Sequence, residues 1–421
     1  MVDYRKYALS RGLTVVTHHA TDTPMAAVGM LVAVGSRDED SSRTGFAHLF
    51  EHLMFGGTET VPDYDRCLSL LGGESNAFTN DDYTYYHSSF PAMGLQEVLN
   101  MEADRLAHLA LTPSALQVQQ QVVTEEYKQR YLGRPYGDMW LQLRPLCYTQ
   151  HPYRWPTIGA DISHVRDATL EDVRSFHQRW YHSANTILAI ASPYTHSEML
   201  HMVEQAFGEQ CVDDVAAGEP VVSQWRKRRY PVEPLQTAPR RLEISRHVPA
   251  DAVYIAYPMG DRWSGHYHVC DMISDILANG NSSRLYRRLV MKGTLVSEAD
   301  AQITGEEGPG LLLLSARLLS NANVDDAIEA LRHEAQQLVL TQLSRQELNK
   351  VANKYESTFF LSQYKATDRV MSLCHNTWLG RTEWVNDEPL IYRSISPIQL
   401  QQTAEEIFRP ERENILVIKK I

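Results

Sequence analysis

The hydrophobic pattern at the start of the chain predicts two strands followed by a helix. Apolar and β-branched residues dominate positions 13–16 and 26–34, which is typical of β-strands. A turn at 35–38 separates the second of these from a stretch whose apolar residues recur at helical spacing and which ends at Gly56. The first elements are therefore expected in the order strand, strand, turn and helix.

The second half of the chain repeats this order. Positions 241–245 and 252–257 have the strand pattern, a turn follows at 260–262, and a helical stretch ends at Gly280. Because the same succession of elements occurs twice, we interpret the chain as a diverged internal duplication.

Each half closes on a helix followed by a strand. The helical patterns at 169–181 and 396–408 both begin with a Ser or Thr that can cap a helix, and strand patterns follow at 185–191 and 414–418. Strands come in adjacent runs rather than alternating one by one with helices, which favours an α+β fold. We predict two similar domains, each a mostly antiparallel sheet with helices packed on one face.

A segment rich in proline and charge separates the two halves. The prediction is a first domain at 1–211, a linker at 212–240 and a second domain at 241–421. The linker contains a basic cluster at 225–230, for which we expect a solvated position.

Composition argues against several classes of protein. The chain has 421 residues and a net charge of −12, without the basic surplus typical of nucleic-acid binding. Its apolar runs are far shorter than the ~20 residues that span a bilayer, and its first residues lack the apolar stretch of a secretory signal. We therefore expect a cytoplasmic protein that binds neither nucleic acid nor membrane. The five cysteines are odd in number and far apart, so we expect buried thiols rather than disulfides.

The segment at 44–58 contains the candidate chemistry. His48 and His52 are four residues apart, so on a helix both imidazoles project from one face and can bind one metal ion. Glu51 lies three residues after His48, where its carboxylate can reach a metal-bound water without being a ligand. The neighbouring residues are apolar, and a charged triplet on such a helix would be costly to bury without an ion. The pattern favours a zinc site with Glu51 as the proton acceptor.

A catalytic zinc ion needs a third protein ligand. The helical pattern at 117–130 offers Glu125 and Glu126, whose side chains point about 100° apart, so only one of them can face the metal. Glu126 shares a face with the apolar Val122 and Val123, which favours it. Spacing alone leaves Glu125 open as the alternative.

These segments resemble the family of pitrilysin, insulin-degrading enzyme and mitochondrial processing peptidase, in which an inverted His-x-x-Glu-His motif binds zinc. The resemblance extends over nearly the whole chain and keeps the family's order of motifs. The matching segments are 35–37, 45–58, 72–79, 122–126, 151–154 and 283–286.

The resemblance implies a zinc endopeptidase with one Zn²⁺ per chain. By the family pattern, His48, His52 and Glu126 hold the metal, and Glu51 is the general base that acts on zinc-bound water. The second half has no copy of the motif. We therefore expect the first domain to carry the zinc and the second to be a non-catalytic homologue.

The resemblance also implies how substrate binds. In the family, a strand at the sheet edge beside the zinc pairs with the substrate peptide, which is added as a further β-strand. The matching residues are Asn76, Ala77 and Phe78, although from the residues alone Asn76 could equally be a turn residue after two glycines. The expected substrates are peptides or unfolded segments, because only an extended chain can pair with a sheet edge.

A partner chain is a further expectation from the resemblance. Long family members hold two such units in one polypeptide, and this chain corresponds to one unit, so we expect a dimer. Many relatives grip the substrate with an Arg and, seven residues later, a Tyr, and here those places hold Val290 and Ser297. Arg287, Arg288 and Lys292 lie close by in the sequence and are the alternatives within this chain after a small shift of the alignment. We expect a heterodimer with a related chain that supplies the Arg/Tyr pair, and a homodimer is the second possibility.

The family also offers an alternative function. Some members are non-catalytic structural or peptide-binding subunits, and these usually lack the zinc motif. All four of His48, Glu51, His52 and Glu126 are present here, which favours the enzyme.

Overall fold

The computed structural model describes residues 1–215, 225, 228–305 and 307–421. These residues form two compact units, each assembled from three separate segments of the chain. The first unit contains 1–127, 156–230 and 360–388, and the second contains 128–155, 231–359 and 389–421.

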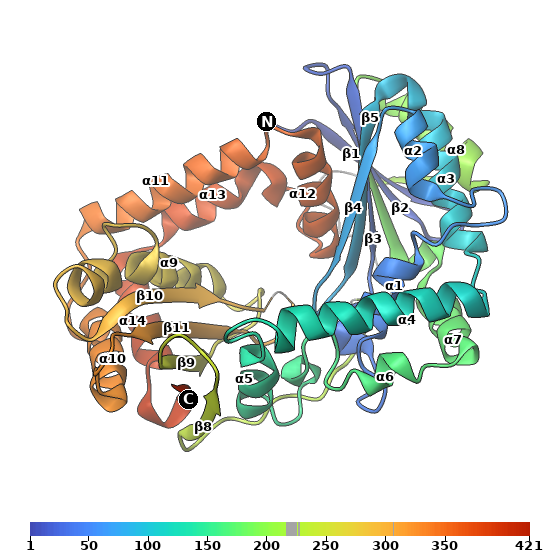
Figure 1. Ribbon diagram of the computed structural model, residues 1–421. Helices are drawn as coiled ribbons and strands as arrows, with labels where there is room; N and C mark the ends of the chain where they lie inside the picture. Colours follow the sequence, from blue (N-terminus) through green and yellow to red (C-terminus); the bar gives the residue numbers. More distant parts are fainter. Residues whose placement is uncertain (216–224, 226–227, 306) are drawn as a thin grey trace. The chain divides into compact units, whose positions relative to one another are not determined.

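The first unit is built on a mostly antiparallel sheet (Figure 1). Among the described residues it has seven strands, in the order β4 (Glu74–Thr79), β5 (Thr84–Pro91), β3 (Met25–Val32), β6 (Thr186–Ser192), β2 (Thr14–His19), β1 (Tyr4–Leu9) and β7 (Cys211–Val215). Neighbouring strands are antiparallel except for β2 and β6, which are parallel. The strands predicted at 13–16, 26–34 and 185–191 are confirmed as β2, β3 and β6.

One face of this sheet is covered by helices from the same half of the chain. They are α1 (Phe46–Leu53), which packs on β4 and β5, α3 (Leu95–His108), which packs on β3, and α8 (His196–Phe207), which packs on β2. The other helices of this half that belong to the unit are α2 (Tyr64–Leu70), α4 (Pro113–Tyr127), α6 (Ser163–Arg166) and α7 (Leu170–Trp180).

The opposite face is covered by α12 (Ala366–Trp378), a helix from near the end of the chain (Figure 1). Leu373 and Cys374 of α12 share a buried cluster with Leu31 of β3 and Ala189 of β6. As a result β6 is buried along its whole length, and β3 is buried at all but its first residue.

The second unit repeats this sheet. Its five strands among the described residues lie in the order β10 (Val296–Ile303), β11 (Leu311–Leu318), β9 (Ala252–Pro258), β12 (Asn414–Lys420) and β8 (Arg240–Arg246). Strands β8 and β12 are parallel and the other neighbours are antiparallel. This matches β4, β5, β3, β6 and β2 strand for strand, so the predicted duplication and the α+β fold class are confirmed.

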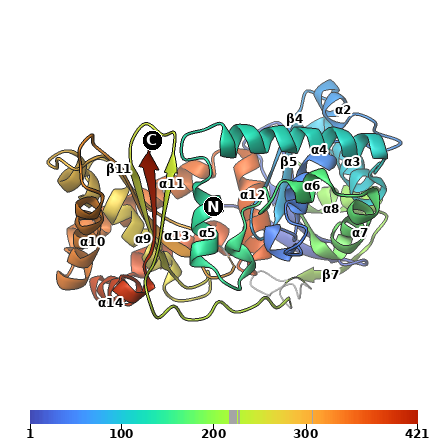
Figure 2. The same cartoon turned by 60° about the horizontal axis from the view of Figure 1, so that its bottom comes forward.

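Helices again cover both faces of the second sheet. The predicted packing of helices on one face alone is therefore wrong for both sheets, because their central strands are apolar on both sides. On one face lie α9 (Tyr267–Ala278) and α10 (Val324–Leu340), with α14 (Pro397–Ile407) packed on both. The other face packs against α5 (Met139–Cys147), whose Leu143 shares a buried cluster with Tyr254 and Leu416 (Figure 2). The chain passes from the second unit to the first within α11 (Arg345–Ser362) and back within α13 (Trp384–Ser394).

Each unit thus includes a helix from the other half of the sequence, α12 in the first and α5 in the second. Both are the third helix after corresponding hairpins, β4–β5 and β10–β11. The predicted domains at 1–211 and 241–421 differ from the compact units in these helices, and the predicted linker at 212–240 includes most of β7. The reason is physical, because a helical pattern reveals an apolar face without revealing which sheet covers it.

The basic cluster at 225–230 also differs from its prediction. Trp225 is 2% exposed and belongs to the buried cluster beside α12. Arg228 donates to the Oδ1 atom of Asp38 at 3.0 Å, and the Tyr230 hydroxyl donates to the same oxygen at 2.7 Å. The predicted solvated position is wrong for Trp225, whose apolar ring packs in this cluster, and for Arg228, because the buried carboxylate of Asp38 requires a charged or polar partner. Outside the described residues lie 216–224, Arg226 and Lys227.

Two smaller expectations concern membranes and thiols. In the part of the chain that the structure describes, no helix is both long and apolar enough to cross a bilayer. All five cysteines are free thiols, and Cys147, Cys270 and Cys374 are buried as expected, whereas Cys67 and Cys211 are partly exposed.

The packing of Tyr85 generates a stability prediction. Tyr85 in β5 is buried, and its hydroxyl has no hydrogen-bond partner among the described residues. A buried hydroxyl without a partner is destabilising, so Tyr85→Phe should raise the free energy of unfolding by about 1 kcal/mol. Tyr64→Phe is the control, because the Tyr64 hydroxyl donates to Glu102 at 2.6 Å and its loss should lower that free energy by about 1 kcal/mol. Urea denaturation measures both, and a less stable Tyr85→Phe variant would contradict the prediction.

Candidate active site

Helix α1 carries the two histidines predicted to bind a metal. The helix begins after Gly45, whose φ of 90° lies in the left-handed region. A Cβ atom at this position would approach the carbonyl oxygen of Ile158 to 2.8 Å, so the glycine is also required by space. On α1, His48 and His52 are one turn apart, with their ring centroids 4.9 Å from each other.

The N-terminus of α1 is held by Glu39, a residue that sequence reasoning missed. Its buried carboxylate accepts hydrogen bonds from the main-chain N–H groups of Gly45 and Ala47, each at 2.8 Å. Burial raises the pKa of Glu39, and these two hydrogen bonds oppose that rise. A carboxylate near a helix N-terminus is a favourable arrangement, but the turn that brings Glu39 back to α1 is not visible in the spacing.

The third predicted ligand lies at the end of α4. Glu126 follows the fully buried Val123 by three residues, and α4 packs against α1. Val122, predicted to face inward as well, is 44% exposed, and Glu125 is exposed. The face of α4 that turns toward α1 therefore carries Val123 and Glu126.

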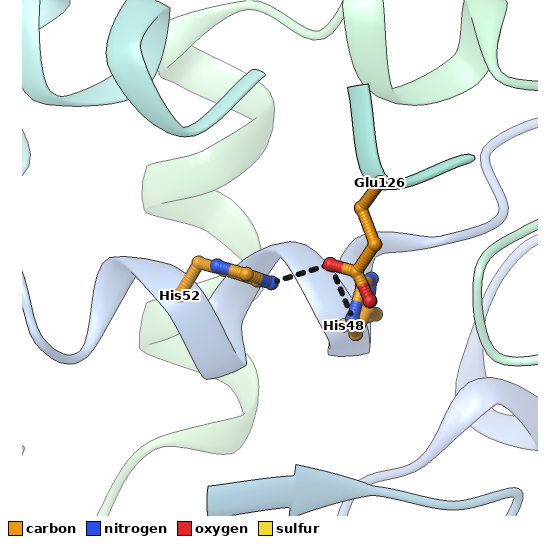
Figure 3. Close-up of side chains that lie close together, drawn as sticks. All are labelled: His48, His52 and Glu126. Carbon is orange, nitrogen blue, oxygen red and sulfur yellow. Dashed lines mark ion pairs between the residues drawn. The ribbon is translucent and has the colours of Figure 1, made fainter. Parts of the chain in front are cut away.

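The three predicted metal ligands converge (Figure 3). The Oε2 atom of Glu126 lies 3.3 Å from Nε2 of His52 and 3.7 Å from Nε2 of His48. One ligand atom from each of the three residues lies within 4.8 Å of the other two. The alternative ligand Glu125 is not part of this cluster.

These distances fit the requirements of a zinc site. Two ligand atoms at about 2.05 Å from a tetrahedral zinc ion are about 3.4 Å apart, close to both distances between Glu126 and the histidines. Two imidazoles and one carboxylate are a donor set of catalytic zinc sites, in which the fourth position stays open. The residues present could therefore hold Zn²⁺.

Glu51 lies on the same helix, one residue before His52. It is partly exposed. Burial is the main cause that raises the pKa values of the nearby Tyr86 and Tyr181 hydroxyls, and the charge of Glu51 adds a smaller contribution in the same direction. Helix α1 thus carries Glu51 together with the two histidines of the cluster, and the role of Glu51 as proton acceptor stays a prediction.

The predicted substrate-binding residues lie in the edge strand β4. Among the strands that the structure describes, β4 pairs with β5 alone. Asn76 is exposed, and its Oδ1 atom accepts a hydrogen bond from the N–H group of Ala77 at 2.8 Å. The ring of Phe78 packs against those of Tyr83 and Tyr85. Because α1 packs beside β4, an additional strand at this edge would lie next to the metal cluster.

Two parts of the chain match known families of peptidase domains. Residues 14–131, which include the metal cluster and β4, match the family described as Insulinase (Peptidase family M16). Residues 167–355 match the description Peptidase M16 inactive domain. The zinc protease PqqE of Helicobacter pylori is 24% identical over 429 residues, which cover 99% of this chain and 93% of that protein.

Solved structures share the fold. The crystal structure of a protease from Helicobacter pylori has a TM-score of 0.90 at 23% identity, covering 100% of both chains. The crystal structure of pitrilysin has a TM-score of 0.76 at 18% identity, covering 99% of this chain and 45% of pitrilysin. This chain therefore corresponds in fold to about half of pitrilysin.

The geometry of the cluster predicts which glutamate binds metal. Glu126→Gln removes a charged ligand and should weaken zinc binding by more than about tenfold. Glu125→Gln is the matched control and should leave the affinity unchanged, because Glu125 is exposed and outside the cluster. Titration of the metal-free chain with Zn²⁺ against a competing chelator measures both affinities. The opposite ranking of the two variants would overturn this choice of ligand.

Proposed function

Because the chain belongs to the M16 (insulinase) family of peptidases, we propose that it is a zinc-dependent endopeptidase that cleaves peptides or unfolded segments. The observation that carries the proposal is the convergence of His48, His52 and Glu126, two of which lie on the helix that also carries Glu51. Family relatives such as the Helicobacter pylori protein are zinc proteases by name, which supports the same metal here.

The residues of the site divide into metal ligands and a proton carrier. His48, His52 and Glu126 would hold Zn²⁺, which, when bound, supplies a Lewis acid for the scissile carbonyl and acidifies the attacking water. Glu51 accepts the proton of that water and later delivers it to the leaving amine. The apolar surroundings of α1, with Phe46, Leu49, Phe50 and Leu53 buried, strengthen the attraction between these charges by excluding water.

Strand β4 would bind the substrate. One edge of β4 has no partner strand among the described residues, so a peptide can add there as a further strand, with main-chain hydrogen bonds that tolerate many sequences. Asn76, Ala77 and Phe78 are the residues that such a peptide would meet. A compact folded protein does not offer an extended segment, so peptides and unfolded segments are the proposed substrates.

The match to an inactive domain is compatible with an active enzyme. It spans 167–355, which excludes every member of the metal cluster. The alternative of a non-catalytic subunit would leave the convergence of two histidines and a glutamate without a role.

Replacement of the proposed base tests the mechanism. Glu51→Gln should bind zinc as the wild type does, while kcat falls by at least about a hundredfold, because the ligands remain and the proton acceptor is lost. Hydrolysis of an unstructured peptide and the zinc content per chain are measured together. Near-normal activity of Glu51→Gln would exclude Glu51 as the base, and a metal-free, inactive wild type would favour the non-catalytic alternative.

We also propose a partner chain. Val290 ends a π-helix at Tyr286–Val290, and Ser297 lies in β10, so the two places aligned with the Arg/Tyr pair of many relatives carry neither a guanidinium nor a phenol. A related chain in a heterodimer would supply these groups. A homodimer is the second possibility.

The purified chain alone distinguishes the two assemblies. For a heterodimer, the chain alone should have weak peptidase activity that rises at least about tenfold when a related chain with the Arg/Tyr pair is added. Light scattering after size exclusion gives the oligomeric state of each sample. Full activity of a homodimer would contradict the heterodimer.

A further inference from the structure

A buried tyrosine links the candidate base to the sheet. Tyr86 lies in β5 and is fully buried. Its hydroxyl donates a hydrogen bond to the main-chain oxygen of Phe50 in α1, 3.2 Å away. This oxygen belongs to the planar peptide group that joins Phe50 to Glu51. The hydrogen bond therefore restrains the peptide unit from which the Glu51 side chain projects.

A second buried tyrosine completes the contact. The hydroxyl of Tyr181 lies 3.0 Å from that of Tyr86. A hydroxyl has one proton, so Tyr86 gives its proton to Phe50 and accepts one from Tyr181. The ring of Tyr181 also stacks on the ring of Phe50, with centroids 5.0 Å apart at 30°. Phe50 is thus held through both its carbonyl group and its ring.

The position of Tyr86 is itself restrained by buried charges. The guanidinium of Arg105 lies 5.0 Å from the centroid of the Tyr86 ring. Arg105 is ion-paired with Glu102 at 2.7 Å, and both side chains are buried. The Tyr86 hydroxyl therefore has little freedom to leave Phe50.

The same tyrosine faces the proposed substrate strand through the sheet register. Tyr86 is directly opposite Ala77 of β4 in the antiparallel pair. Glu51 directly follows Phe50, so its backbone adjoins the carbonyl group that the Tyr86 hydroxyl holds. Tyr86 thus contacts α1, which carries Glu51, through its hydroxyl, and pairs with β4, the proposed substrate strand, through its backbone.

We propose that the hydroxyl pair of Tyr86 and Tyr181 positions Glu51 relative to a peptide bound at β4. This inference rests on the proposed peptidase function. Both tyrosines are positioning residues, because neither hydroxyl reaches the metal cluster or the strand edge in the contacts described above. Loss of the pair would displace the base without removing it, so the chemical step would slow while substrate binding persisted.

Tyr85 provides a matched control on the same strand. It is the neighbour of Tyr86, is buried to the same degree, and has a hydroxyl without a hydrogen-bond partner among the described residues. Tyr85→Phe and Tyr86→Phe therefore remove the same atom from adjacent buried rings. Only the second removes hydrogen bonds to α1.

The experiment compares kcat, KM and zinc content of the active assembly for Tyr85→Phe, Tyr86→Phe, Tyr181→Phe and the double variant Tyr86→Phe/Tyr181→Phe. Tyr86→Phe should lower kcat by about tenfold, with KM within about twofold and zinc content unchanged. Tyr85→Phe should keep the wild-type kcat. The double variant should be no slower than Tyr86→Phe, because the two hydroxyls act through one chain of hydrogen bonds.

Each other outcome overturns the inference. Equal kcat values for Tyr85→Phe and Tyr86→Phe, a change confined to KM, or a loss of zinc would each exclude positioning of Glu51. A wild type without peptidase activity would remove the proposed function and this role with it. An active wild type with an unaffected Tyr86→Phe variant would remove this role alone.

Discussion

The burial of both faces of the central strands is the constraint on which the first unit depends. Strands β3 and β6 are apolar on either side, so the sheet is shielded from water only when helices cover it twice. Helices α1, α3 and α8 provide one cover, and α12 provides the other. The sheet then becomes a rigid support that carries α1 on its face and leaves β4 at its edge. Sites supported by packed helices and strands hold their side chains more precisely than sites on loops.

Helix α1 is short and carries two imidazoles and a carboxylate in apolar surroundings, where polar groups are costly to bury. Its position is determined at its N-terminus and at its middle turn. Glu39 and Gly45 fix where the helix begins, and the hydroxyl of Tyr86 holds its middle turn to the sheet. Groups that are already oriented need little reorganisation when charge develops during a reaction. The contacts around α1 thus serve the geometry of the cluster as much as the stability of the fold.

The sequence predicted features that depend on the spacing of neighbouring residues, and it did not predict contacts between segments far apart in the chain. Strand patterns, the duplication and the histidine pair depend on spacing within a few residues, and all of these are present as predicted. The position of Glu126 beside the histidines was predictable, because Glu126 shares a helical face of α4 with the buried Val123. The helix exchange and the burial of Trp225 depend on contacts between segments more than a hundred residues apart, which no periodicity reveals. The wrong prediction for Val122 has a different cause, since an apolar residue at the flank of a helix can face either the protein or the solvent without changing the apolar spacing.

The exchange of α5 and α12 also has a consequence for biosynthesis. The ribosome completes β6 at Ser192, but the helix that covers its second face begins only at Ala366. At about 5–20 residues per second, this face of the nascent sheet waits on the order of ten to forty seconds for its cover. During that time Leu31 and Ala189 belong to an exposed apolar surface on a tethered, half-made protein. The order of helices along the chain therefore lengthens the time during which the first sheet is prone to aggregation while the second half is being made.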